Sequence, residues 1–246
     1  FNGRPPFLLH GMNEQEVLNG IRLAGAGRIV LVRNRPEQDK LKKALKTELV
    51  FTINDAKGLE FDTVFLWKIG TESGSSDLWR RIHEGEALDR HHHPHLKHEL
   101  NLLYVAVTRA RNTLVIYDGE APSRVWGLEA LRDKLYRTSE KVALSEIWQR
   151  ASSPEEWEQQ GDYFFEREYY PAAMECYKNG GNLRKKEVAE AFVLETRNCH
   201  ADAAQLFEKH HDHARAAENY EKSHHYERAM GLWARVGNEA RAGLCR

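Results

Sequence analysis

Short apolar runs alternate with longer segments of mixed polarity in the first half of the chain. A run that is apolar on both of its alternating faces is typical of a strand covered on both sides. Such runs occur at Phe7–Leu9, Ile29–Val32, Leu49–Ile53, Thr63–Trp67 and Leu114–Tyr117. Because segments with helical spacing of apolar residues lie between them, the pattern predicts an α/β fold with a mostly parallel, covered sheet.

The segments between these strands carry helix signals. Asn13 suits the N-cap of a helix that runs to Leu23, in which apolar residues recur at helical spacing. Pro36 suits the first turn of a second helix, because a proline there loses no helical hydrogen bond. Residues 125–136 are expected to form the helix that closes this domain, and a short helix is expected at 144–151.

Residues 69–96 lack such a pattern and are rich in Gly, Ser, His and charged residues. We expect a surface loop with one helical turn around Leu78 and Trp79, and a small contribution to the core. The histidines at 91–93, 95 and 98 suggest a metal cluster, but Pro94 interrupts their helical spacing and no Cys or acidic ligand holds a recognisable spacing. The sequence therefore predicts no metal site.

The second half of the chain contains an internal repeat. Large apolar residues follow one another at intervals of 13, 17, 13, 13 and 13 residues, at Phe164, Tyr177, Leu194, Phe207, Tyr220 and Trp233. Alanines lie nine residues after five of them, at Ala173, Ala203, Ala216, Ala229 and Ala242. Thirteen residues hold one short helix and a tight turn, which predicts an all-α solenoid of antiparallel helices that resembles tetratricopeptide-like repeats. An irregular helical bundle is the alternative.

The longer unit after Tyr177 is expected to place its four extra residues in the turn at 179–182. The change of pattern divides the chain into an α/β domain at residues 1–136, a helical linker at 137–153 and the solenoid at 154–246. Arg215, Arg228 and Arg241 repeat in phase with the solenoid, without an assigned role.

Composition narrows the class of protein and its compartment. The 246 residues carry 36 basic and 37 acidic side chains, so any contact with nucleic acid must be local rather than spread over a basic surface. Three cysteines without a CxxC spacing argue against a disulfide framework and favour a reducing intracellular compartment, cytoplasmic or nuclear. No apolar run approaches the roughly 18 residues of a membrane span. Because the chain begins at Phe1, we expect a fragment of a longer protein.

Residues 99–109 form the segment around which the first half is organised. On a helix, Leu100, Leu103, Tyr104 and Val107 share one apolar face, and Leu102, Val105 and Ala106 share another. A helix with two apolar sides is expected to lie buried between layers. Arg109 follows the second face in the last turn, where it either serves the final carbonyls of the helix or points into a cleft.

Two ordered segments resemble motifs of a known family. Residues 99–111, ELNLLYVAVTRAR, resemble motif VI of the UvrD/Rep type of superfamily 1 helicase, and residues 52–62, TINDAKGLEFD, resemble motif V. An apolar strand follows each of them, as in the family. The resemblance covers roughly residues 1–120 and corresponds to the second RecA-like domain, a fold of the P-loop NTPase type.

The resemblance implies roles for individual residues. In that family ATP lies between two RecA-like domains, and Arg109 is similar to the motif VI arginine that reaches the γ-phosphate and stabilises charge during phosphoryl transfer. Glu60 is similar to the motif V glutamate on the ribose and phosphate side of the nucleotide. Gly58 would let the backbone approach the nucleotide, and Lys57 would orient the same loop. The plain alternative for Lys57 and Gly58 is a strand-exit turn.

Thr52 and Asn54 resemble the part of motif V that contacts the backbone of single-stranded nucleic acid. The family usually has His where Asn54 stands, which weakens the expected contact. Arg33 resembles a basic position upstream and is expected to contact only a turn or the backbone. A helicase accessory domain normally precedes motif V, but only a few residues separate Leu45 from the motif V strand here.

No GxxxxGK[ST] segment occurs in the chain, so the phosphate-binding loop of an ATPase is absent from it. The resemblance therefore implies the C-terminal part of an ATP-dependent helicase or translocase, inactive alone, with ATP and Mg²⁺ held mainly by an upstream domain. Expected partners are single-stranded nucleic acid, with DNA preferred although the motifs do not distinguish it from RNA, and a protein bound by the solenoid; no membrane is expected. The alternative is a catalytically degenerate, helicase-like scaffold that binds protein partners.

Overall fold

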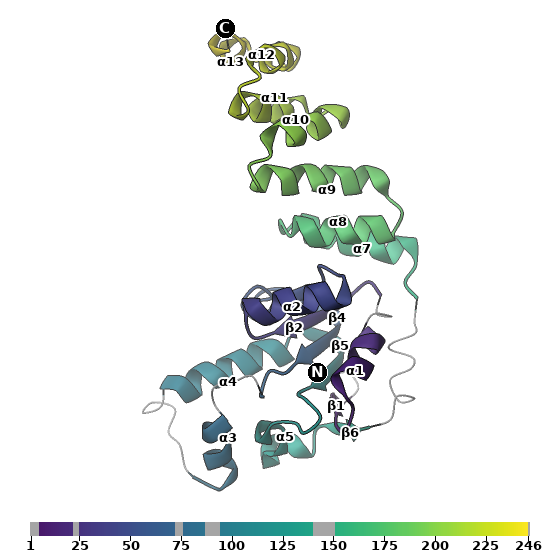
Figure 1. Ribbon diagram of the computed structural model, residues 1–246, viewed down its shortest axis with the longest axis vertical. Helices are drawn as coiled ribbons and strands as arrows, with labels where there is room; N and C mark the ends of the chain where they lie inside the picture. Colours follow the sequence, from purple (N-terminus) through teal and green to yellow (C-terminus); the bar gives the residue numbers. More distant parts are fainter. Residues whose placement is uncertain (1–4, 22–24, 72–75, 87–93, 140–150, 246) are drawn as a thin grey trace. The chain divides into compact units, whose positions relative to one another are not determined.

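A computed structural model of the chain describes residues 5–21, 25–71, 76–86, 94–139 and 151–245 (Figure 1). The chain divides into two compact units, residues 1–151 and residues 152–246. We call them the sheet unit and the helical unit. No helix in the described ranges is long and apolar enough to cross a bilayer.

The sheet unit is built on a six-stranded sheet in the order β3-β2-β4-β5-β1-β6, in which every neighbouring pair is parallel. The strands are β1 (Phe7–Leu9), β2 (Arg28–Val32), β3 (Val50–Thr52), β4 (Phe61–Trp67), β5 (Ala110–Tyr117) and β6 (Tyr136–Thr138). Each predicted apolar run overlaps one of the first five strands. The predicted parallel α/β fold is confirmed.

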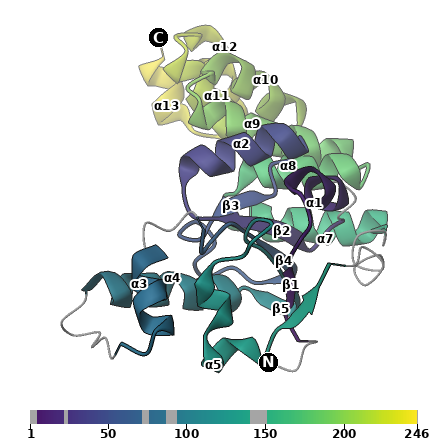
Figure 2. The ribbon, with the colours of Figure 1, turned by 60° about the horizontal axis from the view of Figure 1, so that its bottom comes forward.

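Helices cover the sheet on both faces. Figure 2 shows α1 (Glu14–Ile21) and α2 (Arg35–Leu45) on one side, and α3 (Ser76–His83) and α4 (Pro94–Val107) on the other. Val17 of α1 and Leu41 of α2 share a buried cluster with alternate strand residues, including Val30 and Val32. Full burial of a large aliphatic side chain stabilises the fold by roughly 1.5–3 kcal/mol, so this cluster is a main source of stability.

Side-chain caps fix where the first two helices begin. Asn13 Oδ1 accepts a hydrogen bond from Glu16 N at 2.9 Å, and Glu16 Oε2 accepts one from Asn13 N at 3.3 Å. Asn34 caps α2 by accepting from Glu37 N at 2.9 Å, and Pro36 lies in the first turn. Both predicted helix starts are confirmed, while residues 22–24 at the predicted end of α1 lie outside the described residues.

The prediction of a surface loop at 69–96 was wrong in two places. Residues 76–83 form α3, whose Leu78 and Trp79 are only 8% and 2% exposed and belong to the core. The helix packs against the 3-10 helix η1 (Arg124–Gly127), a partner that lies more than 40 residues away in the sequence. Pro94 begins α4 instead of interrupting it, because the first residue of a helix needs no N–H group.

The predicted closing helix at 125–136 was also wrong. This stretch contains η1, the short helix α5 (Glu129–Arg132) and the start of β6. β6 pairs in parallel with β1, and Tyr136 N donates to Pro6 O at 2.8 Å. An edge strand of only three residues carries too little apolar pattern to be recognised. Most of the helix expected at 144–151 falls outside the described residues.

The prediction that α4 is buried on two opposite sides was wrong as well. Leu96, Glu99 and Ala106 are buried, but Leu100 is 42% exposed and Tyr104 is 68% exposed. Within the described part of the chain, only one side of this helix is covered. On the apolar face predicted to contain Leu100, Leu103, Tyr104 and Val107, the first and third side chains are exposed and the other two are half-buried.

The helical unit is a run of consecutive helices, each packed against the next. They are α7 (Pro154–Phe165), α8 (Tyr170–Asn179), α9 (Leu183–Thr196), α10 (His200–Lys209), α11 (His213–Lys222), α12 (Tyr226–Arg235) and α13 (Glu239–Leu244). A residue with left-handed backbone conformation ends each unit, at Glu168, Gly181, Asn198, His211, His224 and Gly237. Those positions repeat at the same intervals as the large apolar residues, so the periodic prediction corresponds to one helix per unit.

The four extra residues of the long unit lie in a helix. α9 has 14 residues, whereas α8 and α10 have 10 each, so the prediction that the turn at 179–182 holds them was wrong. Four residues are close to one helical turn of 3.6, and the insertion therefore keeps the buried face of α9 turned inward. Phe207, Tyr220 and Trp233 are at most 4% exposed and Ala203 is fully buried, as the repeat predicts.

Candidate functional site

The motif V segment, residues 52–62, runs from the end of β3 back to the start of β4 through a series of tight turns. Ala56 N donates to Thr52 O, Lys57 N to Asn54 O and Leu59 N to Ala56 O, at 3.0, 3.2 and 3.0 Å. Gly58 has a φ of 84°, in the region that favours glycine. Lys57, Gly58 and Glu60 are exposed, so their side chains and backbone face solvent beside the sheet.

The motif VI segment, residues 99–111, covers most of α4 and the start of β5. Thr108 Oγ1 donates to Tyr104 O at 2.8 Å and closes the helix end. Arg109 then leads into the strand, with its N–H on Ala106 O at 3.3 Å. This position places the arginine at the amino end of β5.

The fold brings the ends of the two segments together. Phe61 pairs with Ala110 across β4 and β5, and Phe61 N donates to Arg109 O at 2.9 Å. Arg111 Nε lies 3.2 Å from Glu60 Oε2, a pair that the sequence did not predict. Both members are more than half exposed, so the pair contributes little to stability. Glu60, Arg109 and Arg111 therefore share the amino edge of two neighbouring strands.

All three guanidinium nitrogens of Arg109 donate to acceptors of the sheet unit. Nε donates to Val105 O at 3.0 Å, Nη1 to Leu59 O at 2.9 Å and Nη2 to Thr108 Oγ1 at 3.1 Å. The side chain is half-buried. In this arrangement the arginine serves a helix-end carbonyl, one of the two roles that its spacing allowed, and it also bonds the motif V segment.

The two residues expected to contact nucleic acid differ in accessibility. Asn54 is exposed, but Thr52 is only 5% exposed and its Oγ1 accepts from Asp55 N at 3.1 Å. Arg35 Nη2 bonds Asp55 Oδ1 at 2.9 Å and holds the same turn from α2. Of these two residues, only Asn54 has a side chain that is accessible to solvent.

Arg33 takes part in a buried ion pair that sequence reasoning missed. Its guanidinium forms a two-pronged pair with Glu99, with Nη1–Oε2 and Nη2–Oε1 distances of 3.0 and 2.5 Å. Nη1 also donates to Ile69 O at 3.1 Å, the only type of contact expected from the sequence. Charged side chains are rarely this buried without a partner, but the burial of Glu99 is seen only in the structure, and no spacing in the sequence marks a contact over 66 residues.

Asp118 was missed for a similar reason. Its fully buried carboxylate accepts from Gly70 N, Thr71 N, Ser123 N and Trp126 Nε1, at 2.9, 2.9, 3.1 and 2.8 Å. These donors come from the segments that follow β4 and β5. Asp118 therefore organises the carboxyl edge of the sheet, opposite to Arg109.

A hollow of about 460 Å³ lies at that carboxyl edge, lined by residues that include Thr71, Arg80 and Arg124. Both arginines are already paired, with Glu84 in common. The hollow is separate from the motif V and motif VI residues. In the described ranges, no three His, Cys, Asp or Glu side chains are placed to hold a metal ion; His91–His93 lie outside those ranges.

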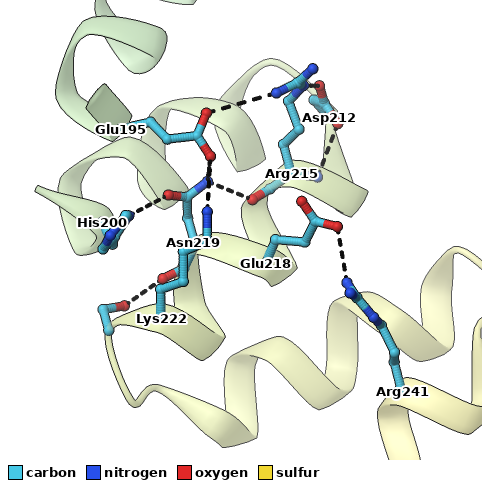
Figure 3. A network of polar contacts seen from close by, with 9 residues as sticks. Glu195, His200, Asp212, Arg215, Glu218, Asn219, Lys222 and Arg241 are labelled. Atoms are coloured by element: carbon cyan, nitrogen blue, oxygen red, sulfur yellow. Dashed lines mark hydrogen bonds and ion pairs between the residues drawn. The ribbon is translucent and has the colours of Figure 1, made fainter. Parts of the chain in front are cut away.

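In the helical unit, polar side chains connect α11 to α9, to α10 and to α13 (Figure 3). Asn219 is fully buried, accepts from His200 Nδ1 at 2.9 Å and donates to Glu195 Oε1 at 2.9 Å. Its second amide proton goes to Arg215 O at 3.0 Å, so the amide is saturated. Because no group of Asn219 remains free, this cluster is a structural link between α9 and α11.

The periodic arginines have a common structural role. Their guanidinium carbons lie over an aromatic ring of the preceding helix, at 5.9 Å for Arg215 and Phe207, 5.5 Å for Arg228 and Tyr220, and 4.7 Å for Arg241 and Trp233. Lys185 takes the same place over Tyr177 at 5.6 Å. Burial, and then the hydrogen bond to Asp162, raise the pKa of Tyr177. The repeat is therefore held by stacked cations as well as by apolar contacts.

Comparisons with known proteins agree with the family resemblance of the motif V and motif VI segments. Residues 27–119 match the family model of the UvrD-like helicase C-terminal domain, so the resemblance predicted from motifs V and VI is confirmed. Over 201 residues the chain is 30% identical to the human (Homo sapiens) protein named TPR and ankyrin repeat-containing protein 1. That alignment covers 68% of this chain but 7% of the human protein. No solved structure matches the chain.

Proposed function

We propose that this UvrD-like helicase C-terminal domain supplies one side of an ATP site in a nucleic-acid helicase or translocase, and that a P-loop domain of the full-length protein supplies the other. The observation that carries the proposal is the meeting of the two segments at one edge. Arg109 bonds Leu59 O, between Gly58 and Glu60, and β4 and β5 hold both segments in register. A nucleotide placed at this edge would meet the arginine and the motif V loop together.

In this proposal Arg109 is the catalytic residue. A guanidinium is permanently charged and its planar fork engages two phosphate oxygens at once, which stabilises the charge that develops during phosphoryl transfer. Its present acceptors, Leu59 O, Val105 O and Thr108 Oγ1, are all neutral. Hydrogen bonds to charged acceptors are about twice as strong, so an incoming phosphate would compete well for the side chain.

Glu60, Lys57 and Gly58 form the rest of the proposed nucleotide side. Glu60 would accept from ribose hydroxyls, Lys57 would add positive charge, and the missing side chain at Gly58 would admit the phosphates. The described acidic residues form no cluster that fits Mg²⁺, and the proposal assigns the ion to the P-loop domain together with the phosphates.

For the nucleic-acid side, we assign the contact to Asn54 and the neighbouring backbone. Thr52 has its hydroxyl in an internal hydrogen bond and contributes by shaping the turn. The strand would be single-stranded, with DNA preferred. The helical unit would bind a protein partner, an assignment supported by the repeat of α7 to α13 and by the repeats that the human relative's name contains.

A second candidate function is a protein-binding scaffold without ATP hydrolysis. Two observations favour it: every guanidinium nitrogen of Arg109 is used inside the domain, and the Thr52 hydroxyl is buried. Asn54 in place of the usual His points the same way. The two candidates differ in one measurable property, which is whether ATP turnover depends on Arg109.

The first prediction tests this property in the full-length protein. Arg109→Ala should leave nucleotide binding nearly unchanged and lower ATP turnover by roughly 10³-fold or more, because an arginine finger acts mainly on the transition state. Arg111→Ala is the matched control, since Arg111 lies two residues away and its guanidinium pairs with Glu60 at the exposed edge. Turnover should be measured under saturating nucleotide and single strand. A folded Arg109→Ala protein with unchanged turnover would favour the scaffold.

A further inference from the structure

The side chain of Arg109 is connected to the motif V segment through a main-chain carbonyl oxygen. Nη1 donates to Leu59 O, while Nε and Nη2 fix the same guanidinium on Val105 O and Thr108 Oγ1 at the end of α4. The side chain therefore ties the carbonyl between Gly58 and Glu60 to the helix end. These bonds use three of the five N–H groups of the guanidinium, so a side chain that turns towards an acceptor outside the domain gives up its bond to Leu59 O.

The tied carbonyl belongs to a continuous chain of hydrogen bonds. Leu59 N donates to Ala56 O at 3.0 Å, and Ala56 N donates to Thr52 O at 3.0 Å. Asp55 N closes the same turn on Thr52 Oγ1 at 3.1 Å. The chain of bonds thus runs from Arg109 to the turn that contains Thr52 and Asn54, at the other end of the motif V segment.

Gly58 makes the tied carbonyl easy to release. Its φ of 84° is open to glycine, and a Cβ built there would meet nothing within 4 Å. Glycine has the widest range of backbone conformations, so the backbone at Gly58 can rearrange once the neighbouring hydrogen bonds break. The side chain of Leu59 is buried, at 4% exposure, and stays anchored in the core, so the change would involve the backbone from residue 54 to the Leu59 carbonyl.

We propose that Arg109 is a latch on the motif V segment: it holds the turn at residues 52–59 closed when its guanidinium is on Leu59 O, and it releases that turn when the guanidinium moves to phosphate. The phosphate end of this inference rests on the proposed function, whereas the latch is a property of this chain alone. Because coupling between two sites is reciprocal, a strand that binds the released turn better than the closed turn would favour the position of Arg109 on phosphate.

Hydrogen exchange of this chain without nucleotide tests the latch. Arg109→Met keeps the aliphatic stem but removes all donors, and Arg111→Met is the matched control with the same chemical change on a side chain that bonds Glu60 at the exposed edge. We expect Arg109→Met to speed exchange of the Ala56, Lys57 and Leu59 amides about tenfold or more, and Arg111→Met to leave them unchanged. Unchanged exchange in a folded Arg109→Met chain overturns the latch, and so does equal acceleration in both variants.

Protection of the Val115 and Ile116 amides in β5 reports whether a variant is folded. If Arg109→Met loses this protection, Arg109→Lys is tested in its place. A single ammonium group should give exchange rates of the Ala56, Lys57 and Leu59 amides between those of the unmodified chain and of a chain without the arginine donors. Unchanged exchange in the folded lysine variant overturns the latch. ATP turnover tests the proposed function separately. If Arg109→Met speeds amide exchange without nucleotide but ATP turnover does not depend on Arg109, the latch is supported and the ATPase proposal fails. If amide exchange is unchanged but turnover depends on Arg109, only the latch fails.

Discussion

Gly161 and Gly231 are both glycines inside helices, but their surroundings differ. A Cβ at Gly161 of α7 would lie 2.5 Å from Tyr177 Cε1 and 2.6 Å from Cδ1, whereas a Cβ at Gly231 of α12 would meet nothing within 4 Å. The ring of Tyr177 is held by its hydroxyl on Asp162 at 2.8 Å and has little freedom to move. Residue-level packing therefore predicts opposite effects for the same substitution.

We predict that Gly161→Ala destabilises the helical unit by roughly 1–3 kcal/mol, because a methyl group inserted into a filled site forces its neighbours apart. Gly231→Ala should stabilise it by roughly 0.5–1 kcal/mol, because alanine loses less backbone entropy in a helix. Urea unfolding of the two variants and the unmodified chain would measure both. Equal effects at the two positions would mean that Tyr177 does not pack on Gly161.

Sequence reasoning named candidate functional residues only where a local motif contains them. Arg109, Glu60 and Gly58 were found from two motifs, and the structure brings them to one edge. Asp118 and the pair Arg33–Glu99 were missed, since their partners lie 48 and 66 residues away and no local spacing marks such contacts. The hydrogen bonds of Arg109 to Leu59 O and Val105 O could not be predicted either, because every residue has a main-chain carbonyl and the residue type does not show which one accepts a bond.

At the scale of elements, the pair Arg33–Glu99 ties the end of β2 to α4. The side chains are 14% and 2% exposed, so the pair is almost dehydrated. We predict that Glu99→Leu costs roughly 3–5 kcal/mol, because it leaves Arg33 charged without its partner. The double change Arg33→Met with Glu99→Leu should cost clearly less than the two single changes together. A double-mutant cycle from chemical unfolding would measure the difference, and additive costs would argue against direct coupling.

The helices of the repeat depend on their aromatic layers. Trp233 is 4% exposed, and its Nε1 donates to Glu221 Oε1 at 2.6 Å. We predict that Trp233→Ala or Tyr220→Ala destabilises the helical unit by roughly 3–5 kcal/mol, through lost burial and the cavity that remains. Unfolding of the unit followed by circular dichroism would measure this. A loss below about 1 kcal/mol would place these rings at the surface and end the layered interpretation.

Elements with strong local periodicity were predictable, and elements defined by distant partners were not. The buried strands β2 and β5 follow from apolar runs, and the 13-residue period gives the helices from α10 to α13. The sequence predicted only one turn of α3, because the partner of this helix, η1, lies far along the chain. The extra turn of α9 was misplaced because a four-residue insertion keeps helical phase and leaves the pattern unchanged.

At the scale of the whole molecule, two cores of different kinds follow one another. The sheet unit is stabilised by contacts between strands far apart in sequence, such as β1 with β5, whereas each helix of the helical unit packs mainly on its neighbours. A repeat of helices is stabilised by contacts between adjacent helices, so the helical unit can fold without the sheet unit. The two compact units meet in sequence at residues 151 and 152.

We therefore predict that the two units are separable. Limited proteolysis should cut first near residues 150–154, where Ala151, Ser153 and Pro154 are exposed, and should leave a fragment that begins near Pro154 with its helical circular dichroism intact. The strands β2 and β5 are the internal control, since buried, hydrogen-bonded backbone resists proteases until the unit unfolds. Early cleavage inside either strand, or loss of helix signal in the C-terminal fragment, would show that the helical unit depends on the sheet unit for its stability.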